Sequence, residues 1–194
     1  MEKSSIHNIF KEIDLSDEKI EVLANHLTKV NCKKGELLVR QGESVSNKYF
    51  IYSGCLRSFF IDEQGKEHTL QFAIKDWWIS DYPGYFQGRK AIMNIECIQD
   101  SVLIKMTKNN RDVLFNHVPQ LESFFRLKFE NTIASFQKRT IASLSYSAKE
   151  KYIQFVNTYA EIEQNVRNYH IASYLGITKE SLSRIRKEIA KGDS

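Results

Sequence analysis

Cysteine, proline and long apolar runs are scarce in this chain, and each scarcity excludes a class of protein. The 194 residues hold 3 Cys and 2 Pro. Cys32, Cys55 and Cys97 are odd in number and far apart, so they indicate neither a disulfide framework nor a zinc or iron–sulfur site. No apolar run approaches the roughly 18 residues of a membrane helix, and the polar N-terminus is unlike a secretory signal. We therefore expect reduced, buried thiols in a cytoplasmic protein that holds no cofactor and contacts no membrane.

Metal-binding and catalytic clusters are also missing from the sequence pattern. The five histidines are scattered, and for each a surface or packing role is favoured over haem or metal ligation. They are His7, His26, His68, His117 and His170. A cupin-like enzyme would need two histidines and a carboxylate converging inside a barrel, but only His68 falls within the expected strands. No Ser/His/Asp, Cys/His or paired-carboxylate arrangement is legible, so the sequence predicts a protein that is not an enzyme.

The net charge of +4 is unevenly distributed along the chain. Residues 1–137 hold 18 Lys and Arg against 18 Asp and Glu, whereas residues 138–194 hold 10 against 6. A neutral front and a basic end are typical of a sensor domain joined to a domain that binds a polyanion.

Residues 30–106 have the pattern of a small β domain, and they follow about thirty residues with helical spacing. Six of the 8 glycines fall between positions 35 and 88 and separate short runs of β-type residues. Residues 62–66 have the composition of a hairpin turn. The expected strands are 36–40, 49–52, 56–61, 68–74, 92–98 and 102–106. This many short strands predict a jelly roll or barrel.

A long helix is predicted over residues 119–145, because apolar residues recur three or four apart over more than five turns. They are Leu121, Phe124, Phe125, Phe129, Ile133, Phe136 and Ile141. The stripe is too wide for one contact surface, which favours a homodimer through this helix over a helix docked only on its own sheet. Ser147 and Glu150 then have the spacing of a capping box. One helix should therefore end near Ser145 and another begin at Ala148.

Residues 170–186 predict two short helices around a tight turn. Gly176 supplies the open conformation that ends the first helix, and the Thr178 hydroxyl caps the second. Leu182, Ile185 and Ile189 form the buried face of the second helix. The opposite face is cationic and polar and consists of Lys179, Ser183, Arg184, Arg186 and Lys187. Such a helix suits a DNA major groove; the alternative is a helical hairpin with a solvated basic face.

Taken in order, these elements and their motifs resemble the Crp/Fnr family of bacterial transcription regulators, and in particular its Bacteroidetes subgroup. Residues 33–43 (KKGELLVRQGE) and 49–57 (YFIYSGCLR) are similar to the first strands and the next glycine turn of the family's β-roll. Residues 171–186 (IASYLGITKESLSRIR) are similar to its DNA-reading signature. The resemblance implies an α+β fold. It would consist of a cyclic-nucleotide-binding-like β-roll (jelly roll) over 1–110, a long dimerisation helix and hinge over 111–146, and a helix–turn–helix domain over 147–194.

The resemblance also implies double-stranded DNA as a partner, with RNA polymerase as a second. The family's base-reading positions match Lys179, Glu180 and Arg184, and Ser183 faces the same groove. Arg184 is suited to guanine and Glu180 to cytosine N4, while Thr178 and Lys191 are expected at phosphates. The expected DNA-binding residues are Thr178, Lys179, Glu180, Ser183, Arg184, Arg186, Lys187 and Lys191.

The effector region departs from the family's pattern. Cyclic-nucleotide binders hold the ribose and phosphate with a Gly-Glu pair and a later Arg followed by small residues, and residues 76–94 lack this arrangement. Phe136 and Gln137 stand where the long helix of such binders offers hydroxyl groups. We therefore expect no cyclic AMP binding, and we expect any other small-molecule effector to occupy an aromatic pocket. Its candidate residues are Trp78, Tyr82, Tyr85, Phe86, Arg89 and Phe136; the alternative is that these rings only fill the roll.

One alternative comes from another class of protein: a small-molecule or cyclic-nucleotide sensor module that binds no DNA. The basic end of the chain and the stripe from Lys179 to Arg186 favour the DNA-binding regulator.

Overall fold

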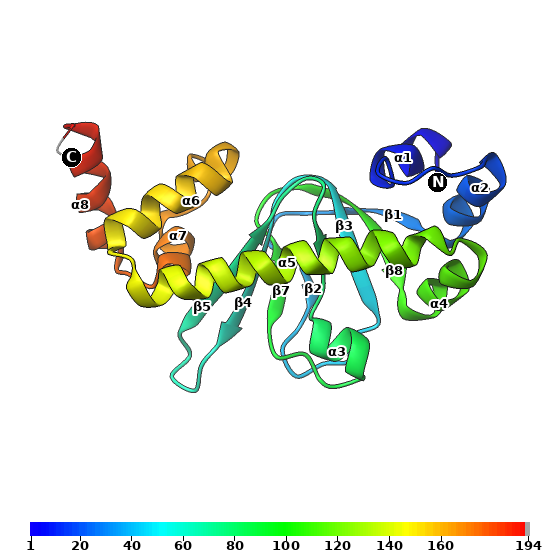
Figure 1. Ribbon diagram of the computed structural model, residues 1–194. Helices are drawn as coiled ribbons and strands as arrows, with labels where there is room; N and C mark the ends of the chain where they lie inside the picture. Colours follow the sequence, from blue (N-terminus) through cyan, green and yellow to red (C-terminus); the bar gives the residue numbers. More distant parts are fainter. Residues whose placement is uncertain (193–194) are drawn as a thin grey trace. The chain divides into compact units, whose positions relative to one another are not determined.

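The computed structural model describes residues 1–192, which form two compact units (Figure 1). The first unit comprises Met1–Phe60 and Phe72–Glu130, and the second comprises Ile61–Gln71 and residues 131–192. Within residues 1–192, no helix combines the length and apolar character needed to cross a membrane. The expected domain limits after residues 110 and 146 stay predictions.

Two four-stranded antiparallel sheets form the β-roll. The strands are β1 (Thr28–Cys32), β2 (Leu37–Val39), β3 (Asn47–Ser53), β4 (Leu56–Ile61), β5 (Glu67–Ala73), β6 (Trp78–Ile79), β7 (Asn94–Cys97) and β8 (Ser101–Thr107). One sheet has the order β1-β8-β3-β6 and the other β2-β7-β4-β5. The six expected strands are confirmed. Strand β1 lies where helical spacing was expected to continue, because its residues pair with β8 from Thr28↔Lys105 to Cys32↔Ser101.

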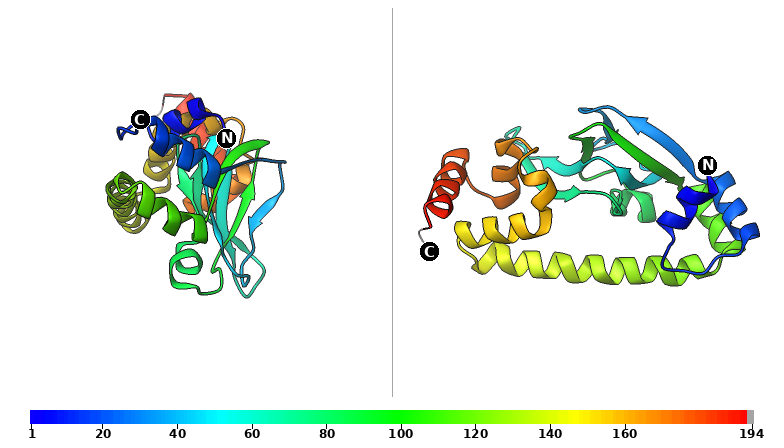
Figure 2. Two further views of the ribbon diagram at one scale, coloured as in Figure 1. Left: turned by 90° about the vertical axis from the view of Figure 1, so that its right-hand side faces the viewer. Right: turned by 90° about the horizontal axis from the view of Figure 1, so that it is seen from above.

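Strand β3 is buried on both faces, and its side chains alternate between two cores. Tyr49 and Ile51 point into the core between the two sheets. Phe50 points the other way, into a second core that the sheet shares with helices. Figures 1 and 2 show α1 (Lys3–Ile9), α2 (Asp17–His26) and α4 (Lys108–His117) gathered together in this unit.

A short helix, α3 (Tyr82–Gln87), was not expected from the sequence. The carboxylate of Asp81 caps it by accepting the Gly84 N–H at 2.8 Å, and Pro83 stands in its first turn, where no N–H is needed. Gly88 ends it with a φ of 68°, a conformation that favours glycine. The Asp-Tyr-Pro-Gly run is thus a helix start embedded in a strand-rich segment.

The long helix α5 (Gln120–Ser145) confirms the expected helix over 119–145 and belongs to both units. Its first turns are anchored in the first unit, where Leu121, Phe124 and Phe125 are buried in the core beside α1, α2 and α4.

The second unit is built on α6 (Ala148–Glu163), α7 (Asn168–Leu175) and α8 (Lys179–Ala190). The expected capping box starts α6: the Ser147 N–H donates to Glu150 Oε2 at 2.7 Å, and the Glu150 N–H donates to Ser147 Oγ at 3.2 Å. Buried side chains from all three helices form its core. They are Tyr152, Phe155, Tyr159, Ile162, Ile171, Ala172, Leu175, Leu182 and Ile185.

The three cysteines are free and buried, in agreement with the expectation of structural thiols. Burial raises the pKa of Cys55 and of Cys97 to about 12. Both side chains therefore stay protonated at neutral pH, which makes them poor nucleophiles.

Lys48 is a buried cation of the first unit. This side chain of β3 is 2% exposed and shares the helix-facing side of its strand with Phe50. Its Nζ lies 3.2 Å from the ring centre of Phe125 and 4.9 Å from that of Trp78. Burial, and then the positive charge of Arg111, lower the pKa of Lys48 well below its ordinary value. The charged form of Lys48 therefore destabilises the folded chain.

We expect Lys48→Met to raise the free energy of unfolding at pH 7 by about 1 to 4 kcal/mol, because an apolar chain of similar length removes a buried charge. The unfolded chain binds the Lys48 proton more tightly than the folded chain. The free energy of unfolding of the unmodified protein therefore rises with pH relative to that of the variant. The stability advantage of Lys48→Met shrinks as pH approaches 10. Urea unfolding of both proteins between pH 6 and 10 measures this difference. A variant that is less stable at pH 7 would show that the two rings compensate the charge.

Candidate nucleic-acid interface

The turn between α7 and α8 has the chemistry expected from the sequence. Gly176 ends α7 with a φ of 70°, a left-handed conformation. Thr178 Oγ1 accepts the Ser181 N–H at 3.2 Å and caps α8. The Thr178 hydroxyl also lies 3.2 Å from Ser181 Oγ, so its hydrogen-bonding capacity is used inside the turn. Thr178 is thus confirmed as a cap, and its expected phosphate contact stays a prediction.

Five of the expected residues lie together on one face of α8, around a shallow depression. They are Lys179, Glu180, Ser183, Arg184 and Lys187. We call this set the α8 face. Three of its members are cationic and one is acidic, so it attracts anions while keeping one hydrogen-bond acceptor. The pKa of Glu180 is lowered by a hydrogen bond from its own backbone N–H and by the Thr178 hydroxyl, so its carboxylate is charged at neutral pH.

Arg184 is an exposed member of the α8 face. Its side chain is 74% exposed, and Nε lies 3.9 Å from Glu188 Oε1, one helical turn along. An exposed ion pair of this length contributes little free energy, so the guanidinium can leave it at small cost. Lys191 is exposed at the C-terminal cap of α8, beyond the α8 face.

The expectation that Arg186 shares the cationic face of α8 is wrong. Its guanidinium turns to the other helices of the unit, where Nε donates to Tyr152 Oη at 3.1 Å and Nη1 to Asn168 Oδ1 at 2.6 Å. Nη2 forms an ion pair with Glu163 Oε1. The pattern of charged and apolar residues in the sequence does not distinguish a solvated arginine from one whose partners lie on neighbouring helices.

The structure does not bring the six expected effector residues into one site. Trp78 packs on the helix side of its sheet, with ring centres 5.3 Å from Phe50 and 5.1 Å from Phe125. Tyr82 and Phe86 are stacked at 5.7 Å and both meet Phe129 at 5.5 Å.

Of the other expected effector residues, Tyr85 also joins this cluster, with its ring centre 5.2 Å from that of Phe86. Tyr85 is buried in the core between the sheets, Arg89 is exposed, and Phe136 belongs to the second unit and is 43% exposed. Tyr82, Tyr85 and Phe86 thus form one aromatic cluster with Phe129, whereas Trp78 packs against Phe50 and Phe125.

One acid of this region, Asp81, was missed by the sequence reasoning. It is fully buried. Besides capping α3, its Oδ2 accepts the N–H groups of Ile92 at 2.8 Å and Met93 at 3.2 Å. The carboxylate is thus committed to three backbone donors that tie α3 to the segment before β7.

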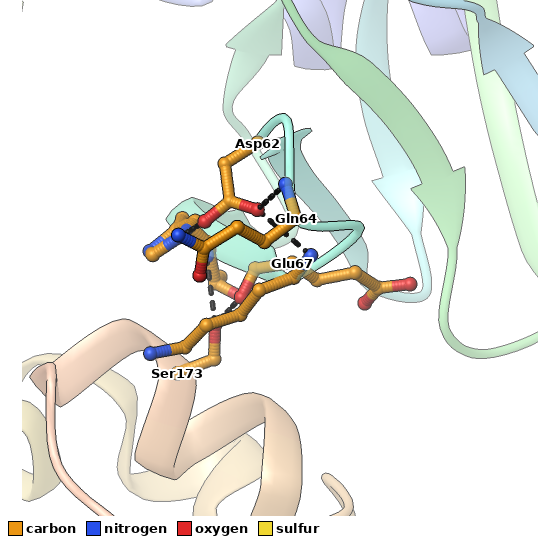
Figure 3. A network of polar contacts seen from close by, with 7 residues as sticks. Asp62, Gln64, Glu67 and Ser173 are labelled. Carbon is orange, nitrogen blue, oxygen red and sulfur yellow. Dashed lines mark hydrogen bonds and ion pairs between the residues drawn. The ribbon is translucent and has the colours of Figure 1, made fainter.

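A second unexpected feature is a polar network between the β4–β5 hairpin tip and α7, within the second unit (Figure 3). Ser173 Oγ accepts the Thr69 N–H and donates to the Glu67 carbonyl, both at 2.9 Å. The Tyr169 hydroxyl donates to Glu67 Oε2 at 2.8 Å. Ser173 therefore satisfies one donor and one acceptor of the β5 backbone, as a neighbouring strand would.

The hairpin that meets Ser173 is itself well ordered by Asp62. Asp62 Oδ1 accepts the N–H groups of Gln64 and Lys66, both at 2.9 Å, and Oδ2 lies 2.7 Å from His68 Nε2. The hydrogen bond from His68, followed by that from Lys66, lowers the pKa of Asp62. The hairpin turn expected at residues 62–66 is confirmed, and the Asp62 carboxylate contacts three residues of the hairpin.

Comparison with known proteins gives concordant matches. Residues 29–117 match the family model of the cyclic nucleotide-binding domain. The regulatory protein HlyX of Actinobacillus pleuropneumoniae is 25% identical over 199 residues, which cover 93% of this chain and 80% of that protein. The fumarate and nitrate reduction regulatory protein of Vibrio cholerae is 23% identical, with 94% of this chain and 74% of that protein covered.

Among solved structures, a putative transcriptional regulator of the Crp/Fnr family from Eubacterium rectale superposes with a TM-score of 0.72 at 17% identity. The superposition covers 95% of this chain and 89% of that one, so the fold is shared over nearly the whole length.

We expect Ser173→Ala to lower the free energy of unfolding by about 1 to 2 kcal/mol, because two hydrogen bonds to the hairpin backbone are lost. The Thr69 amide should also exchange its hydrogen faster, since its acceptor is removed. Hydrogen exchange with urea unfolding measures both effects. Ser183→Ala is the matched control, because Ser183 is an exposed serine of the α8 face. Unchanged exchange at Thr69 would show that the Ser173 hydroxyl does not hold the hairpin.

Proposed function

Since this chain belongs to the Crp/Fnr family of transcription regulators, we propose that it binds an inverted-repeat DNA site as a homodimer through the α8 face. The observation that carries this proposal is the grouping of Lys179, Glu180, Ser183, Arg184 and Lys187 on one exposed side of a helix that follows a tight turn. A helix of this kind fits the major groove, where base edges present donors and acceptors in a sequence-dependent pattern.

Each member of the α8 face has a chemical role in this proposal. Arg184 donates two parallel hydrogen bonds to guanine O6 and N7, because its guanidinium is exposed and held by only one long ion pair. Glu180 is charged and accepts from cytosine N4. Lys179 and Ser183 face the same groove. Lys187 and Lys191 approach phosphates, where cations contribute affinity without sequence preference.

The proposed dimer rests on the apolar side chains that α5 leaves exposed. They are Leu127, Ile133, Phe136, Ile141 and Leu144. Ile133 is 59% exposed and Leu144 is 83% exposed. Ile133 and Phe136 are three residues apart, as are Ile141 and Leu144, which is the spacing of a helix that packs on another helix. A second copy of α5, related by a two-fold axis, supplies a matching surface.

The effector part of the proposal is a site that does not bind cyclic AMP. Asp81 is the buried acid of residues 76–94, and its oxygens already accept three backbone N–H groups, so it is not available to a ribose hydroxyl. Arg89 is exposed and offers no buried cation to a cyclic phosphate. An effector of other chemistry and a contact with RNA polymerase are further parts of this proposal.

We expect the double variant Ile133→Glu, Leu144→Glu to be monomeric at micromolar concentration, because two carboxylates per chain would meet their copies across the two-fold axis. Phe129 is left unchanged, since it packs against Tyr82 and Phe86 and its loss would damage the first unit. Light scattering measures the mass, with Arg184→Ala as a variant that should stay dimeric. A monomeric mass for the unmodified chain would refute the dimer.

We expect Arg184→Ala to weaken binding to the preferred inverted repeat by about 1 to 3 kcal/mol per half-site and to relax preference at one base position. Lys191→Gln should weaken all duplexes alike and reduce the salt dependence by about one unit per contact. Titrations against the preferred repeat and a scrambled duplex at several salt concentrations separate the two effects. If the unmodified protein binds neither duplex with salt dependence, the DNA-binding proposal fails in favour of a sensor module.

A further inference from the structure

Arg186 lies at the centre of a polar cluster that joins all three helices of the second unit. Its partners are Tyr152 near the start of α6, Glu163 at the end of α6 and Asn168 at the start of α7. The Tyr152 hydroxyl also donates to Glu163 Oε1 at 2.7 Å, so the cluster is closed on itself. Every nitrogen of the Arg186 guanidinium has a partner within the protein.

The cluster is partly shielded from water. The Arg186 side chain is 28% exposed and that of Glu163 is 16% exposed. Partial burial strengthens charge-assisted hydrogen bonds relative to the same pair on the surface. The cluster raises the pKa of Arg186: its partners Tyr152 and Glu163 outweigh the loss of solvent, so the guanidinium stays charged.

Arg186 can fix the rotation of α8 through directional hydrogen bonds, whereas the other buried contacts of this helix are apolar. The buried contacts of α8 are the apolar side chains of Leu182 and Ile185, and apolar packing has little directional preference. A planar guanidinium with three differently placed acceptors is directional, and a lysine cannot reproduce its fork. The rotation of α8 about its own axis, and so the direction of Arg184 two residues earlier, depends on this cluster.

We propose that Arg186 is a positioning residue for DNA recognition: it orients the α8 face without touching DNA. This inference rests on the proposed function, because it explains what orients the α8 face that the proposed function assigns to DNA binding. It makes Glu163, an acid that cannot itself attract DNA, a determinant of sequence discrimination.

The test measures affinity for two duplexes as a function of salt. The probes are an inverted repeat selected from random DNA by the unmodified protein and a scrambled duplex of the same composition. The variants are Arg186→Lys, which keeps the charge, and Glu163→Gln, which removes a negative charge. Their matched controls are Arg167→Lys and Glu161→Gln, the same changes at exposed positions of the same unit.

We expect both test variants to lower the ratio of specific to scrambled affinity by roughly tenfold or more, the value of one bidentate base contact. The salt dependence should stay unchanged, because no phosphate contact is lost. Both controls should keep the ratio. Plain electrostatics predicts the opposite for Glu163→Gln, namely tighter binding to both duplexes at the same ratio.

Two results would overturn the inference. If Arg186→Lys keeps the ratio and Arg186→Gln reduces the salt dependence by about one unit, Arg186 is a phosphate contact. If Arg186→Lys, Arg186→Gln and Glu163→Gln lower thermal stability but keep the ratio of specific to scrambled affinity at temperatures where they are folded, the cluster is only structural.

A third measurement, amide hydrogen exchange without DNA, should show faster exchange in α8 for Arg186→Lys and not for Arg167→Lys. This arm tests the orienting cluster even if the unmodified protein fails to bind DNA, so the two failures can be distinguished.

Discussion

The structure depends on one constraint: α5 carries apolar side chains over more of its circumference than a single contact can bury. Its first turns solve this within the chain, since Leu121, Phe124 and Phe125 are buried in the helix-side core. Its later turns do not, since Ile133 and Leu144 are mostly exposed. An exposed apolar stripe is costly in water, and in the proposed homodimer a second copy of the same helix removes that cost. The same 26-residue element thus closes the core of the first unit and offers the surface for assembly.

The sequence predicted well wherever a local signal sufficed. The capping box of Ser147 and Glu150, the left-handed Gly176 and the hairpin at 62–66 all depend on residues within a few positions of one another. It failed where the deciding partner is distant in the chain. The start of β1 at Thr28 was missed, and helical spacing was expected up to about residue 30, because the pairing of β1 with β8 is not visible locally. Helix α3 was missed because its start signal stands among strands.

The same distinction separates the two functional regions. All five residues of the α8 face were among the expected DNA-binding residues, because they lie on one helix and helical spacing alone groups them. The six aromatic and basic residues proposed for an effector could not be grouped in this way. Trp78 and Tyr82 are four residues apart, but Trp78 stands on a strand and packs against Phe125, whereas Tyr82 stands on a helix and packs against Phe129. Lys48 shows the same difficulty, because strand alternation identifies its face but not the burial of that face.

The two arginines of α8 differ in their surroundings, and the difference bears on the proposed DNA recognition. Arg184 and Arg186 are two residues apart, about 200° around the helix, so they cannot share a face. One is exposed beside the lysines, and the other is enclosed by partners from α6 and α7. Contacts to bases require a side chain held within a fraction of an ångström of its productive position. A solvated arginine gains that precision only from the direction of its helix. In the proposed complex, Arg184 therefore acts on sequence discrimination through a base contact, and Arg186 acts on it through the direction of α8.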